Sequence, residues 1–525
     1  MTARTDMALP PPHVEVAHMT KRFGPLVALD EVSVDFAPGA FHALLGENGA
    51  GKSTLVKCMM GYYHADDGTL AVDGETRQIT NPKQAHNLGL GMVYQHFTLV
   101  PSMSVAENLV LGEEGLPAII FWKQHLAKLE AFMNSMPFRL DLERPVSSLA
   151  AGEKQKLEIL KQLYLGSRFL ILDEPTSVLT PSEADEILGL MRDMADEGRI
   201  TVVLITHKLR EVETFAREVS VLRHGRLVGQ GEVADLARRD MVRMMIGRES
   251  VPEPAARVEA PRRGLVLEIR DLSVGDDKGL TAVSGVELCV NEGEILGVAG
   301  VSGNGQRELL EVLAGQRQEE TGEILIRGQP YGRTRKEMRD LQVYVLPEEP
   351  LANSCVRSMS VAENLAIRTF DREPNSSRGY FINRGAMRRQ ARDLIERFRI
   401  KTQGPDARIE TLSGGNIQRT VLARELSEDV EVLIVQNPCF GLDINAVAEI
   451  RNRIMEVRNN GAAVLLISED LDEILELADR IVVMFEGRLV YETPRETADV
   501  HEIGRHMAGS GAADGANGET EEATP

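Results

Sequence analysis

The sequence has little cysteine and no long apolar run. Four cysteines occur in 525 residues, at positions 58, 289, 355 and 439, and none forms a CxxC pair. This spacing excludes a zinc ribbon or a cysteine-ligated iron–sulfur cluster and suits a reducing cytoplasm. No apolar run approaches the roughly 18 residues that span a bilayer. The N-terminus, MTARTDMALPPPH, lacks the apolar core of a signal peptide. We therefore expect a protein that stays inside the cell and does not cross a membrane.

Basic side chains are also scarce. The chain carries 59 Lys and Arg against 80 Asp and Glu, a net charge of −21. A large nucleic-acid-binding surface needs an excess of cations, so this balance argues against one. The content of 43% hydrophobic and 26% charged residues is typical of a folded soluble protein. The length exceeds that of one ordinary core, so we expect two domains.

The chain does contain an internal repeat. Four segments of the first half return in the same order in the second: LLGENGAGKSTLVKCMM as GVAGVSGNGQRELLEVL, MSVAENLVL as MSVAENLAI, LAAGEKQKLEIL as LSGGNIQRTVLA, and FLILDEPTSVLT as VLIVQNPCFGLD. Collinear matches predict two related domains, residues 1–250 and 264–508. Residues 251–263, rich in Pro and Ala, are expected to be a linker, and the acidic tail 509–525 is expected to be disordered.

Short apolar runs alternate with helical patterns in each half. FHALLG and TVVLIT have the length and composition of buried strands, whereas KQKLEILKQLYLG and SEADEILGLMRDMADEG have helical periodicity. This alternation predicts an α/β fold in which helices cover a mainly parallel sheet.

A glycine-rich loop in the first half points to phosphate binding. GENGAGKS, from Gly46 to Ser53, fits G-x-x-x-x-G-K-[ST] between a predicted strand and a predicted helix. The backbone N–H groups of such a loop face a phosphate, and the helix N-terminus adds positive potential. Lys52 would reach the β- and γ-phosphates, and the Ser53 hydroxyl would ligate Mg²⁺. The alternative, an ordinary glycine turn, is disfavoured by the strand–loop–helix context.

Further candidates lie at other strand ends. The apolar run FLIL leads into Asp173 and Glu174, which would place Asp173 near a metal and Glu174 near an attacking water. His207, after VVLIT, is a candidate hydrogen-bond donor to the γ-phosphate. Gln95 in MVYQHF could contact metal and water, and Phe23 in TKRFG could stack on adenine. Each of these last three, taken alone, would be an ordinary structural residue.

Together these motifs resemble those of the ABC ATPase family. The phosphate loop matches its Walker A motif, LILDEP matches Walker B, and LSGGNIQ matches the diagnostic signature. Gln95 matches the Q-loop, His207 the switch histidine and Phe23 the aromatic A-loop. The resemblance covers nearly the whole chain. It implies two tandem P-loop domains that use ATP and Mg²⁺, each with a mainly parallel sheet core, an antiparallel β part and a helical subdomain.

The family architecture implies two ATP sites, each built from Walker A of one domain and the signature of the other. The first site has every part. Its implied catalytic residues are Glu174, His207 and Gln95, and its implied metal ligands are Ser53, Gln95 and Asp173. The residues implied to bind ATP are Phe23, Gly46, Glu47, Asn48, Gly49, Ala50, Gly51, Lys52, Ser53, Thr54, Ser413, Gly414 and Gly415.

The second site is degenerate. It keeps Gly300, Gly303 and Gly305 but has Gln306 in place of the lysine. The other losses all concern the same implied site, although they lie in both halves: Gln436 and Asn437 for the carboxylates, Glu469 for the switch histidine, and Ala150 and Ala151 in the signature. We expect this site not to hydrolyse ATP, although its glycines could still cradle a phosphate.

Two such domains without a membrane span resemble the ATPase subunit of importers for simple sugars and nucleosides, most closely the nucleoside group. The resemblance implies ATP hydrolysis at the cytoplasmic face of the inner membrane, two separate permease subunits and an extracytoplasmic substrate-binding protein, with no nucleic acid and no metal beyond Mg²⁺. FTLVPSMSVAENL, after Gln95, is expected to contact the permease, as is LANSCVRSMSVAENL in the second half.

Two alternatives belong to other functional classes. Soluble twin ABC proteins that act on ribosomes share the two-domain architecture. The short linker, the acidic charge and the degenerate second site argue against that alternative. A non-catalytic, ATP-gated interaction module is disfavoured by the intact Lys52, Asp173 and Glu174.

Overall fold

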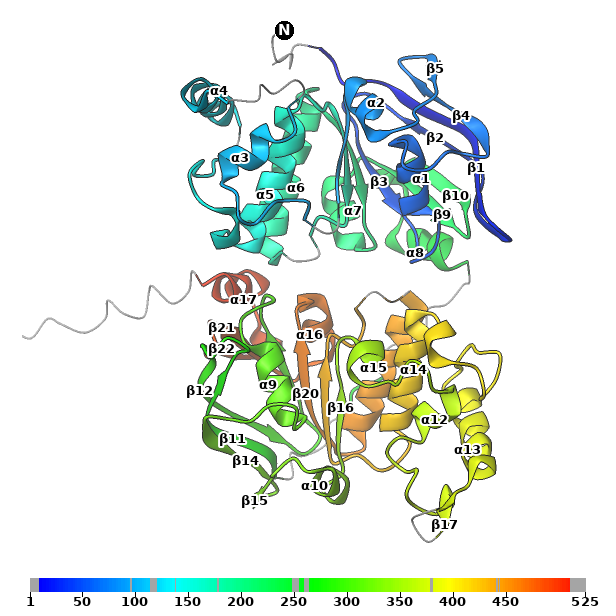
Figure 1. Ribbon diagram of the computed structural model, residues 1–525, viewed down its shortest axis with the longest axis vertical. Helices are drawn as coiled ribbons and strands as arrows, with labels where there is room; N and C mark the ends of the chain where they lie inside the picture. The colour runs from blue at the N-terminus through cyan, green and yellow to red at the C-terminus, as the bar shows by residue number, and fades with distance from the viewer. Residues whose placement is uncertain are drawn as a thin grey trace, which may run out of the picture. The chain divides into compact units, whose positions relative to one another are not determined.

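The computed structural model describes residues 9–94, 97–113, 120–136, 138–176, 179–247, 255–258, 264–377, 381–440, 442 and 444–509. The chain divides into two compact units, Met1–Ser250 and Val251–Pro525. Each unit has the predicted α/β architecture (Figure 1).

A six-stranded sheet forms the centre of the first unit, in the order β10-β9-β3-β8-β7-β6. Its strands run parallel from β9 to β6, and β10 is antiparallel to β9. A four-stranded antiparallel sheet, β2-β1-β4-β5, forms a second β layer. The strand bounds are β1 Val14–Phe23, β2 Leu26–Phe36, β3 Phe41–Leu45, β4 Asp67–Val72, β5 Glu75–Arg77, β6 Leu90–Val93, β7 Phe169–Asp173, β8 Thr201–Ile205, β9 Glu218–Arg223 and β10 Arg226–Glu232.

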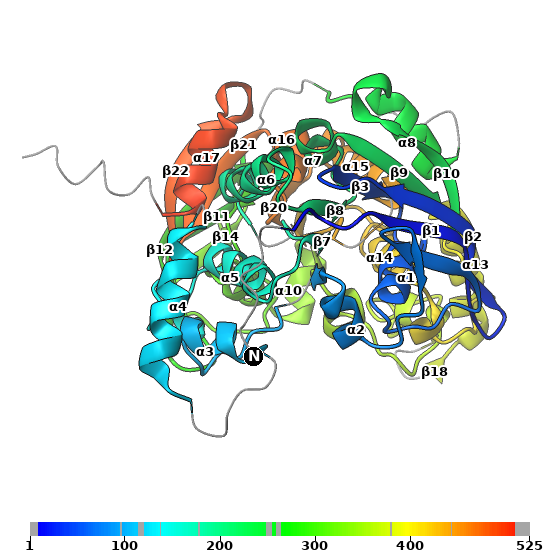
Figure 2. The ribbon, with the colours of Figure 1, turned by 90° about the horizontal axis from the view of Figure 1, so that it is seen from above.

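Helices cover this sheet and form a helical part at one end. Helices α3, α4 and α5 gather at the end of the unit away from β1, β2 and β10 (Figures 1 and 2). This group is the helical subdomain that the family resemblance implies. The helix bounds are α1 Lys52–Met59, α2 Pro82–Asn87, α3 Val105–Val110, α4 Trp122–Asn134, α5 Ala151–Tyr164, α6 Pro181–Asp196, α7 Leu209–Phe215 and α8 Arg238–Ile246.

The central strands are apolar throughout because both faces of the sheet are covered. In β7, Phe169 and Ile171 pack into one core, together with the antiparallel sheet and α1. Leu170 and Leu172 pack into a second core with α5 and α6. Side chains alternate between the two faces of a strand, so two cores, one on each face, require an unbroken apolar run.

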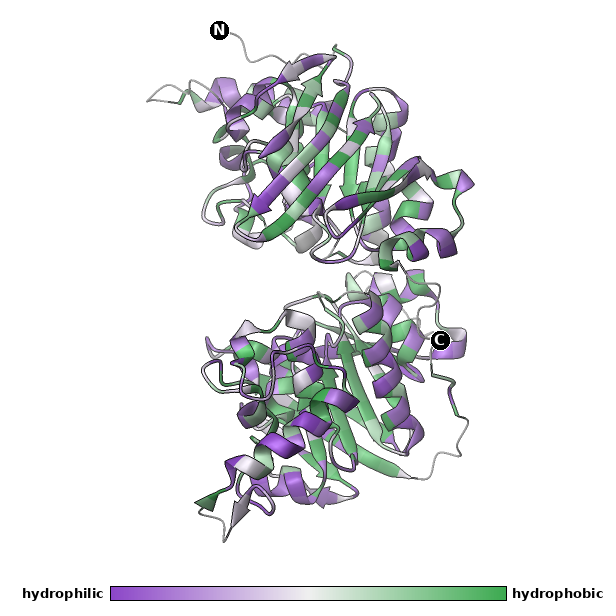
Figure 3. Cartoon of the chain, turned by 90° about the vertical axis from the view of Figure 1, so that its right-hand side faces the viewer, coloured by the Kyte–Doolittle hydropathy of each residue, from purple (hydrophilic) through white to green (hydrophobic). Residues whose placement is uncertain are grey.

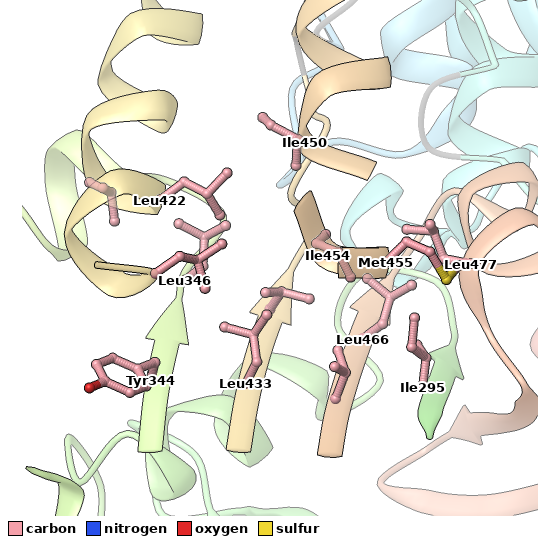
Figure 4. Packing of buried hydrophobic residues seen from close by; sticks show 14 of the residues in the cluster. Ile295, Tyr344, Leu346, Leu422, Leu433, Ile450, Ile454, Met455, Leu466 and Leu477 are labelled. Carbon is pink, nitrogen blue, oxygen red and sulfur yellow. The ribbon is translucent and has the colours of Figure 1, made fainter. Parts of the chain in front are cut away.

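The second unit repeats this plan, with a six-stranded sheet β16-β19-β20-β13-β21-β22 and an antiparallel sheet β12-β11-β14-β15. Its central strands are strongly hydrophobic (Figure 3), and the core that one face shares with α14 and α15 appears in Figure 4. The strand bounds are β11 Leu265–Gly275, β12 Thr281–Asn291, β13 Ile295–Ala299, β14 Thr321–Ile326, β15 Gln329–Pro330, β16 Val343–Leu346, β17 Ser376–Ser377, β18 Phe381–Ile382, β19 Val432–Gln436, β20 Ala463–Ser468, β21 Arg480–Phe485 and β22 Arg488–Pro494.

The helices of the second unit follow the same order. Helices α12, α13 and α14 correspond to the helical part formed by α3, α4 and α5 in the first unit. The helix bounds are α9 Gln306–Leu313, α10 Arg335–Asp340, α11 Pro350–Asn353, α12 Val361–Leu365, α13 Arg384–Arg397, α14 Gly414–Glu425, α15 Ile444–Asn459, α16 Leu471–Leu477 and α17 Val500–Met507. In the described part of the chain, no helix is long and apolar enough to cross a bilayer.

Four residues of the predicted linker are described, and they are held on the second unit. Ala255 N–H donates to Asn452 Oδ1 at 2.5 Å, and Val258 N–H donates to Asn459 Oδ1 at 3.1 Å. Arg257 forms an ion pair with Asp479. The rest of the predicted linker, and the predicted tail beyond Gly509, lie outside the described residues.

The repeated MSVAEN segment has the same local structure in both units. Ser104 caps α3, and Glu107 closes a capping box with it. Asn108 is fully buried and clamps the preceding loop, accepting from Val100 N–H at 2.8 Å and donating to Val100 O at 3.1 Å. Ser360, Glu363 and Asn364 form the same cap and clamp at α12.

Candidate functional site

The glycine-rich loop of the first unit joins β3 to α1, as predicted. Gly46, Gly49 and Gly51 have positive φ values of 157°, 80° and 105°. A Cβ at Gly46 would lie 2.4 Å from Leu222 O, and one at Gly51 would lie 2.7 Å from Ala28 O. The loop is therefore packed so closely against neighbouring backbone that only glycine fits at these two positions. Asn48 and Gly49 are exposed, Glu47 is half-buried and Ala50 is buried.

Lys52 is the first residue of α1, and its side chain lies under the loop. It is 6% exposed, and its Nζ donates to Gly46 O at 2.6 Å and to Glu47 O at 3.1 Å. Burial lowers the pKa of Lys52, while the carboxylates of Glu174 and Asp173 oppose that shift. A cation is thus fixed at the loop, between its carbonyl groups and the two strand-end carboxylates. On the same helix turn, Ser53 is exposed and Thr54 is half-buried.

Asp173 ends β7, and Glu174 follows it in a left-handed conformation with φ of 48°. The Glu174 N–H donates to Ile205 O at 2.9 Å. Burial and the neighbouring Glu174 raise the pKa of Asp173, against the opposing charge of Lys52. Burial would raise the pKa of Glu174 as well, but the hydrogen bond and charge of His207, with the charges of Lys52 and Lys208, more than offset it, and the net shift is downward. Glu174 is therefore held in the ionised form that can accept a proton.

His207 follows β8 and faces the same carboxylate. Its Nδ1 lies 3.0 Å from Glu174 Oε1, and its side chain is 46% exposed. Strands β3, β8 and β7 are neighbours in the sheet, so Lys52, Asp173, Glu174 and His207 meet at their carboxyl ends. This edge of a parallel α/β sheet is where ligands bind.

Glu211 is a site-supporting residue that sequence reasoning missed. It is 3% exposed, and its carboxylate accepts from Thr206 Oγ1 at 2.7 Å and from Thr176 Oγ1. These two threonines lie in the turns that carry His207 and Glu174, so Glu211 ties the two turns together. In the sequence it looks like a solvated charge on an amphipathic helix, and no motif distinguishes it.

Two first-site candidates of the first half remain, Phe23 and Gln95. Phe23 ends β1 and is 41% exposed. Its ring packs edge-on against Tyr63, with 5.2 Å between ring centroids, and Lys21 Nζ lies 5.5 Å from the ring centroid. Gln95 lies outside the described residues.

The signature segment of the second unit opens α14. Ser413 and Gly414 are exposed, Gly415 is half-buried, and Ser413 Oγ accepts from Asn416 Nδ2 at 2.8 Å. A Cβ at Gly414 would meet nothing within 4 Å, and one at Gly415 would make ordinary contacts of 3.6 Å with Leu442 and 3.9 Å with Ala446. Packing inside this unit therefore does not require glycine at either position.

The glycines of the second loop have a packing reason of their own. A Cβ at Gly300 would lie 2.7 Å from Met484 O, and one at Gly305 would lie 2.3 Å from Ala282 O. At Gly303 nothing lies within 4 Å, but φ is 91°. Gln306 Nε2 donates to Val301 O at 3.1 Å, the carbonyl equivalent to the Glu47 O that Lys52 contacts. The glycines are thus explained by the fold of the loop, without the phosphate cradle considered above.

Two carboxylates stand in the second unit where the first has its Q-loop glutamine and switch histidine. The first residue pair between β6 and β7 is Leu90 with Phe169, and the first between β16 and β19 is Val343 with Val432. Counting from these pairs, Glu348 corresponds to Gln95. Glu469 corresponds to His207 in the same way. Sequence reasoning identified Glu469 but missed Glu348, which only the strand register reveals.

The two carboxylates are close enough to influence each other. Burial and the charge of Glu348 raise the pKa of Glu469 to about 7, although a hydrogen bond from Ser302 opposes this shift. Burial also raises the pKa of Glu348, against a hydrogen bond from Asn437. Asn437 Oδ1 accepts from the Glu469 N–H at 2.9 Å. The second unit therefore has two carboxyl groups with raised pKa values and the amide of Asn437 at positions where the first unit has Gln95, His207 and Glu174.

This chain is similar to known proteins over most of its length. The family model described as ABC transporter matches residues 29–177 and 283–439. A glucose import ATP-binding protein, TsgD13 of Haloferax volcanii, is 39% identical over 96% of each chain. A nucleoside import ATP-binding protein, NupA of Lactococcus lactis subsp. cremoris, is 37% identical over 94% of this chain and 98% of its own length.

A solved structure shares the two-unit fold at lower identity. An archaeal ribosome recycling factor, aABCE1, in complex with the stalk protein aP1, is 21% identical to this chain. The match has a TM-score of 0.60 and covers 94% of this chain and 92% of that one. At this identity the likeness concerns the fold alone.

Proposed function

Because this chain belongs to the ABC transporter family of ATP-binding proteins, we propose that it energises the import of a nucleoside or simple sugar through separate membrane permease subunits. As a member of this family, it is an ATPase. The single observation that best supports catalysis is the Glu174–His207 pair beside Lys52, at the carboxyl ends of neighbouring strands.

We assign ATP binding in the first site to the loop Gly46–Thr54, with Phe23 against the adenine. The loop N–H groups and Lys52 would hold the phosphates. Lys52 now donates to two loop carbonyls, and its ammonium would exchange these contacts for phosphate oxygens. The close packing at Gly46 and Gly51 fixes the loop before ATP arrives.

The residues at this site also fit Mg²⁺, which would supply neutralisation of phosphate charge. Ser53, Asp173 and Gln95 would hold it, and all three offer the oxygen ligands that Mg²⁺ prefers. The Asp173 carboxylate is crowded by Glu174, so a nearby cation would relieve its repulsion. Glu174 would then accept the proton of the attacking water, and His207 would position Glu174 and donate to the γ-phosphate.

We further propose that Ser413, Gly414 and Gly415 complete the first site from the second unit. Support comes from their exposure and from the absence of any packing need for the two glycines. Backbone N–H groups at the start of α14 suit a γ-phosphate. The second site, with Glu348, Asn437 and Glu469, would take no part in hydrolysis.

The cargo class rests on the relatives. Proteins named for glucose and nucleoside import are 39% and 37% identical over nearly the whole chain, against 21% for the ribosome recycling factor. The permease subunits and an extracytoplasmic binding protein would select the solute, and this chain would act at the cytoplasmic face of the membrane.

Glu174→Gln tests the catalytic assignment. The amide keeps the shape of the side chain but cannot accept a proton, so we expect ATP binding to persist and turnover to fall by about 10²–10⁴-fold. Asn437→Gln, at the equivalent position of the second unit, is the matched control and should change turnover little. Equal losses in the two variants, or loss of ATP binding in Glu174→Gln, would contradict the assignment. ATP binding and phosphate release are measured separately.

Transport is tested by reconstituting the chain in vesicles together with candidate permease subunits. We expect ATP-dependent uptake of a labelled nucleoside or a labelled hexose, lost with Glu174→Gln. Co-sedimentation with ribosomes, without such uptake, would favour the ribosomal alternative instead.

A further inference from the structure

A shallow, solvent-open cavity in the second unit is lined by Arg335, Arg339, Tyr344, Arg368, Arg372 and Glu428. The lining comes from helix α10, edge strand β16, the segment after α12 and the segment after α14. Four guanidinium groups and one carboxylate thus surround one cavity, in a chain whose net charge is −21. None of the lining residues is among those assigned above to either ATP site.

The floor of the cavity is a fixed aromatic–arginine pair. Tyr344 is 3% exposed, and its hydroxyl points away from β19 (Figure 4) and donates to Glu428 Oε2 at 3.2 Å. Arg368 stacks over this ring, with its guanidinium carbon 4.8 Å from the centroid, and pairs with the buried Glu425 at 2.7 Å. Arg368 is therefore held in place by packing as well as by charge.

The other three arginines are more exposed, and they use fewer of their N–H donors in contacts with neighbouring side chains. Arg335 donates from one Nη to Asp371 at 3.1 Å and stacks over Phe370 at 4.8 Å. Arg339 donates from Nε to Asp340 at 2.9 Å, and its other side-chain N–H groups have no acceptor among the described residues. Arg372 lies 3.7 Å from Glu428, too far for a hydrogen bond. A guanidinium has five N–H donors, so most of these donors remain available for a ligand.

The first unit has a different set of side chains at the same positions. Strand register and the repeated segments place Gly91, Gly112 and Leu165 where the second unit has Tyr344, Arg368 and Glu428. A Cβ at Gly91 would lie 2.3 Å from Ser167 Oγ, and one at Gly112 would lie 2.8 Å from Leu165 Cδ1. In the first unit, a side chain at Gly91 or Gly112 would have to displace the side chain of Ser167 or Leu165.

The two helix arginines differ between the units as well. Arg335 and Arg339 of α10 correspond to Pro82 and His86 of α2. The basic lining is thus a property of the second unit rather than of the shared fold. The core does not explain it, because three of the four arginines are at least one-third exposed along their side chains.

We propose that this cavity is a binding site for a small phosphorylated anion. Arginine pairs with phosphate through two parallel N–H···O bonds, and its planar fork suits this geometry better than an ammonium does. A phosphoryl group offers three strong acceptor oxygens and nearly two negative charges, so several arginines can share it. A carboxylate ligand can also form two parallel hydrogen bonds with a guanidinium, but it needs one guanidinium to do so. Four arginines around one cavity therefore suit a phosphoryl group better than a carboxylate. The proposal does not depend on the ATPase assignment.

The test compares two double variants of the full chain that remove the same charge. Arg339→Gln/Arg372→Gln alters the cavity and leaves the buried Arg368–Glu425 pair intact. Arg388→Gln/Arg408→Gln removes two exposed arginines of the same unit that pair with Asp406 and Glu410. Pyrophosphate is the probe, in magnesium-free buffer and in a Lys52→Ala background, which weakens phosphate binding at the first loop.

Equilibrium dialysis should show saturable pyrophosphate binding that weakens at least tenfold in the cavity variant and less than twofold in the control variant. Hydrogen exchange should slow at residues 335–346 when pyrophosphate binds, with no change at residues 82–93 of the first unit.

A second arm uses phosphatidylcholine vesicles with and without phosphatidic acid. If the wild type binds vesicles that contain phosphatidic acid and the cavity variant does not, the ligand is a lipid headgroup. If the wild type binds pyrophosphate but not these vesicles, the ligand is a soluble phosphate compound.

Three results would overturn the proposal. One is the absence of saturable pyrophosphate binding, and another is an equal loss in the two double variants, which would reflect net charge alone. The third is binding of a polyglutamate peptide but not of pyrophosphate, which would make the cavity a dock for an acidic protein segment.

Discussion

Glu174 and Asn437 share a left-handed backbone conformation, with φ values of 48° and 42°. In both units the N–H of this residue donates to the strand that follows it, at 2.9 Å to Ile205 O and 2.8 Å to Ile467 O. Asparagine adopts this conformation more readily than glutamate does. The proposed catalytic role of Glu174 would explain why the first unit has a glutamate in this unfavourable conformation, whereas the second unit has a residue that tolerates it better.

Lys52 and Gln306 provide a residue-scale test of the asymmetry. Lys52→Ala removes a cation from the phosphates and should reduce ATP hydrolysis by at least about 10²-fold. Gln306→Ala removes a neutral side chain that bonds to its own loop and should leave hydrolysis within a factor of about three, because one neutral hydrogen bond contributes modestly. Steady-state phosphate release measures both. Similar losses would mean that the second site takes part in catalysis.

Glu469 gives the second unit a pH-dependent stability. The pKa of Glu469 is about 7 in the fold, against an ordinary 4.5, so the folded state holds this proton more tightly than the unfolded chain does. The contribution of Glu469 to the free energy of unfolding is therefore highest below pH 4.5 and falls as the pH rises through 7. Glu469→Gln is neutral throughout. It should therefore gain stability over the wild type between pH 5 and pH 8, by at most about 3 kcal/mol.

Urea-dependent hydrogen exchange of the β20 amides measures this difference in stability. The exposed Glu496→Gln, near the end of β22, serves as a charge-matched control. A difference between Glu469→Gln and the wild type that stays constant across this pH range would contradict the prediction.

At the scale of elements, the repeated MSVAEN segment shows how one sequence motif can serve local folding. Its serine caps a helix, its glutamate closes the capping box and its asparagine clamps the preceding loop, identically in both units. A buried asparagine with three partners is costly to replace, by about 1–3 kcal/mol for the unsatisfied groups. Identity between the units here therefore has a sufficient structural cause, whichever partner contacts the loop.

The starts of α14 and α5 make a matched pair of elements. Ser413 and Ala150 are both exposed residues immediately before a helix. If α14 completes the first ATP site, Ser413→Arg places bulk against the γ-phosphate and should reduce hydrolysis by about 10²-fold or more. Ala150→Arg, before α5, should have a much milder effect. Phosphate release in the presence of permease measures both, and the opposite ranking would refute the pairing of units that we propose.

At the scale of the whole molecule, the substitutions of the second site fall in both halves of the chain but concern one function. The first unit has the loop, the carboxylates and the histidine, and the second has the intact signature. Each half is a compact unit, and under the pairing proposed above neither half contains a complete set of catalytic motifs. The two halves are therefore not interchangeable copies, and activity is expected only from the full chain.

Expression of residues 1–250 alone tests this dependence. The fragment retains the loop and Lys52, so ATP binding should persist. It lacks the signature donors to the transition state, so hydrolysis should fall by about 10²-fold or more. Addition of residues 251–525 as a separate chain should restore part of the rate. Full activity of the fragment would show that Ser413–Gly415 contribute nothing to the first site.

Much of the fold could be predicted because it depends on local patterns. Unbroken apolar runs such as FLIL require a strand covered on both faces, and the glycine loop requires a strand before it and a helix after it. For the same reason, Lys52, Asp173, Glu174 and His207 could be grouped before their positions were known. They follow strands whose carboxyl ends meet at one edge of a parallel sheet.

By itself, then, the sequence determined the two α/β units, the complete first set of motifs and the degenerate second set. Only the tertiary structure revealed Glu211 as the tie between two turns, Glu348 as the counterpart of Gln95, and the arginine cavity around Tyr344. It also showed that the second loop keeps its glycines because backbone from distant segments crowds them. These features depend on strand register and on packing between segments far apart in the chain, and no local spacing in the sequence encodes either.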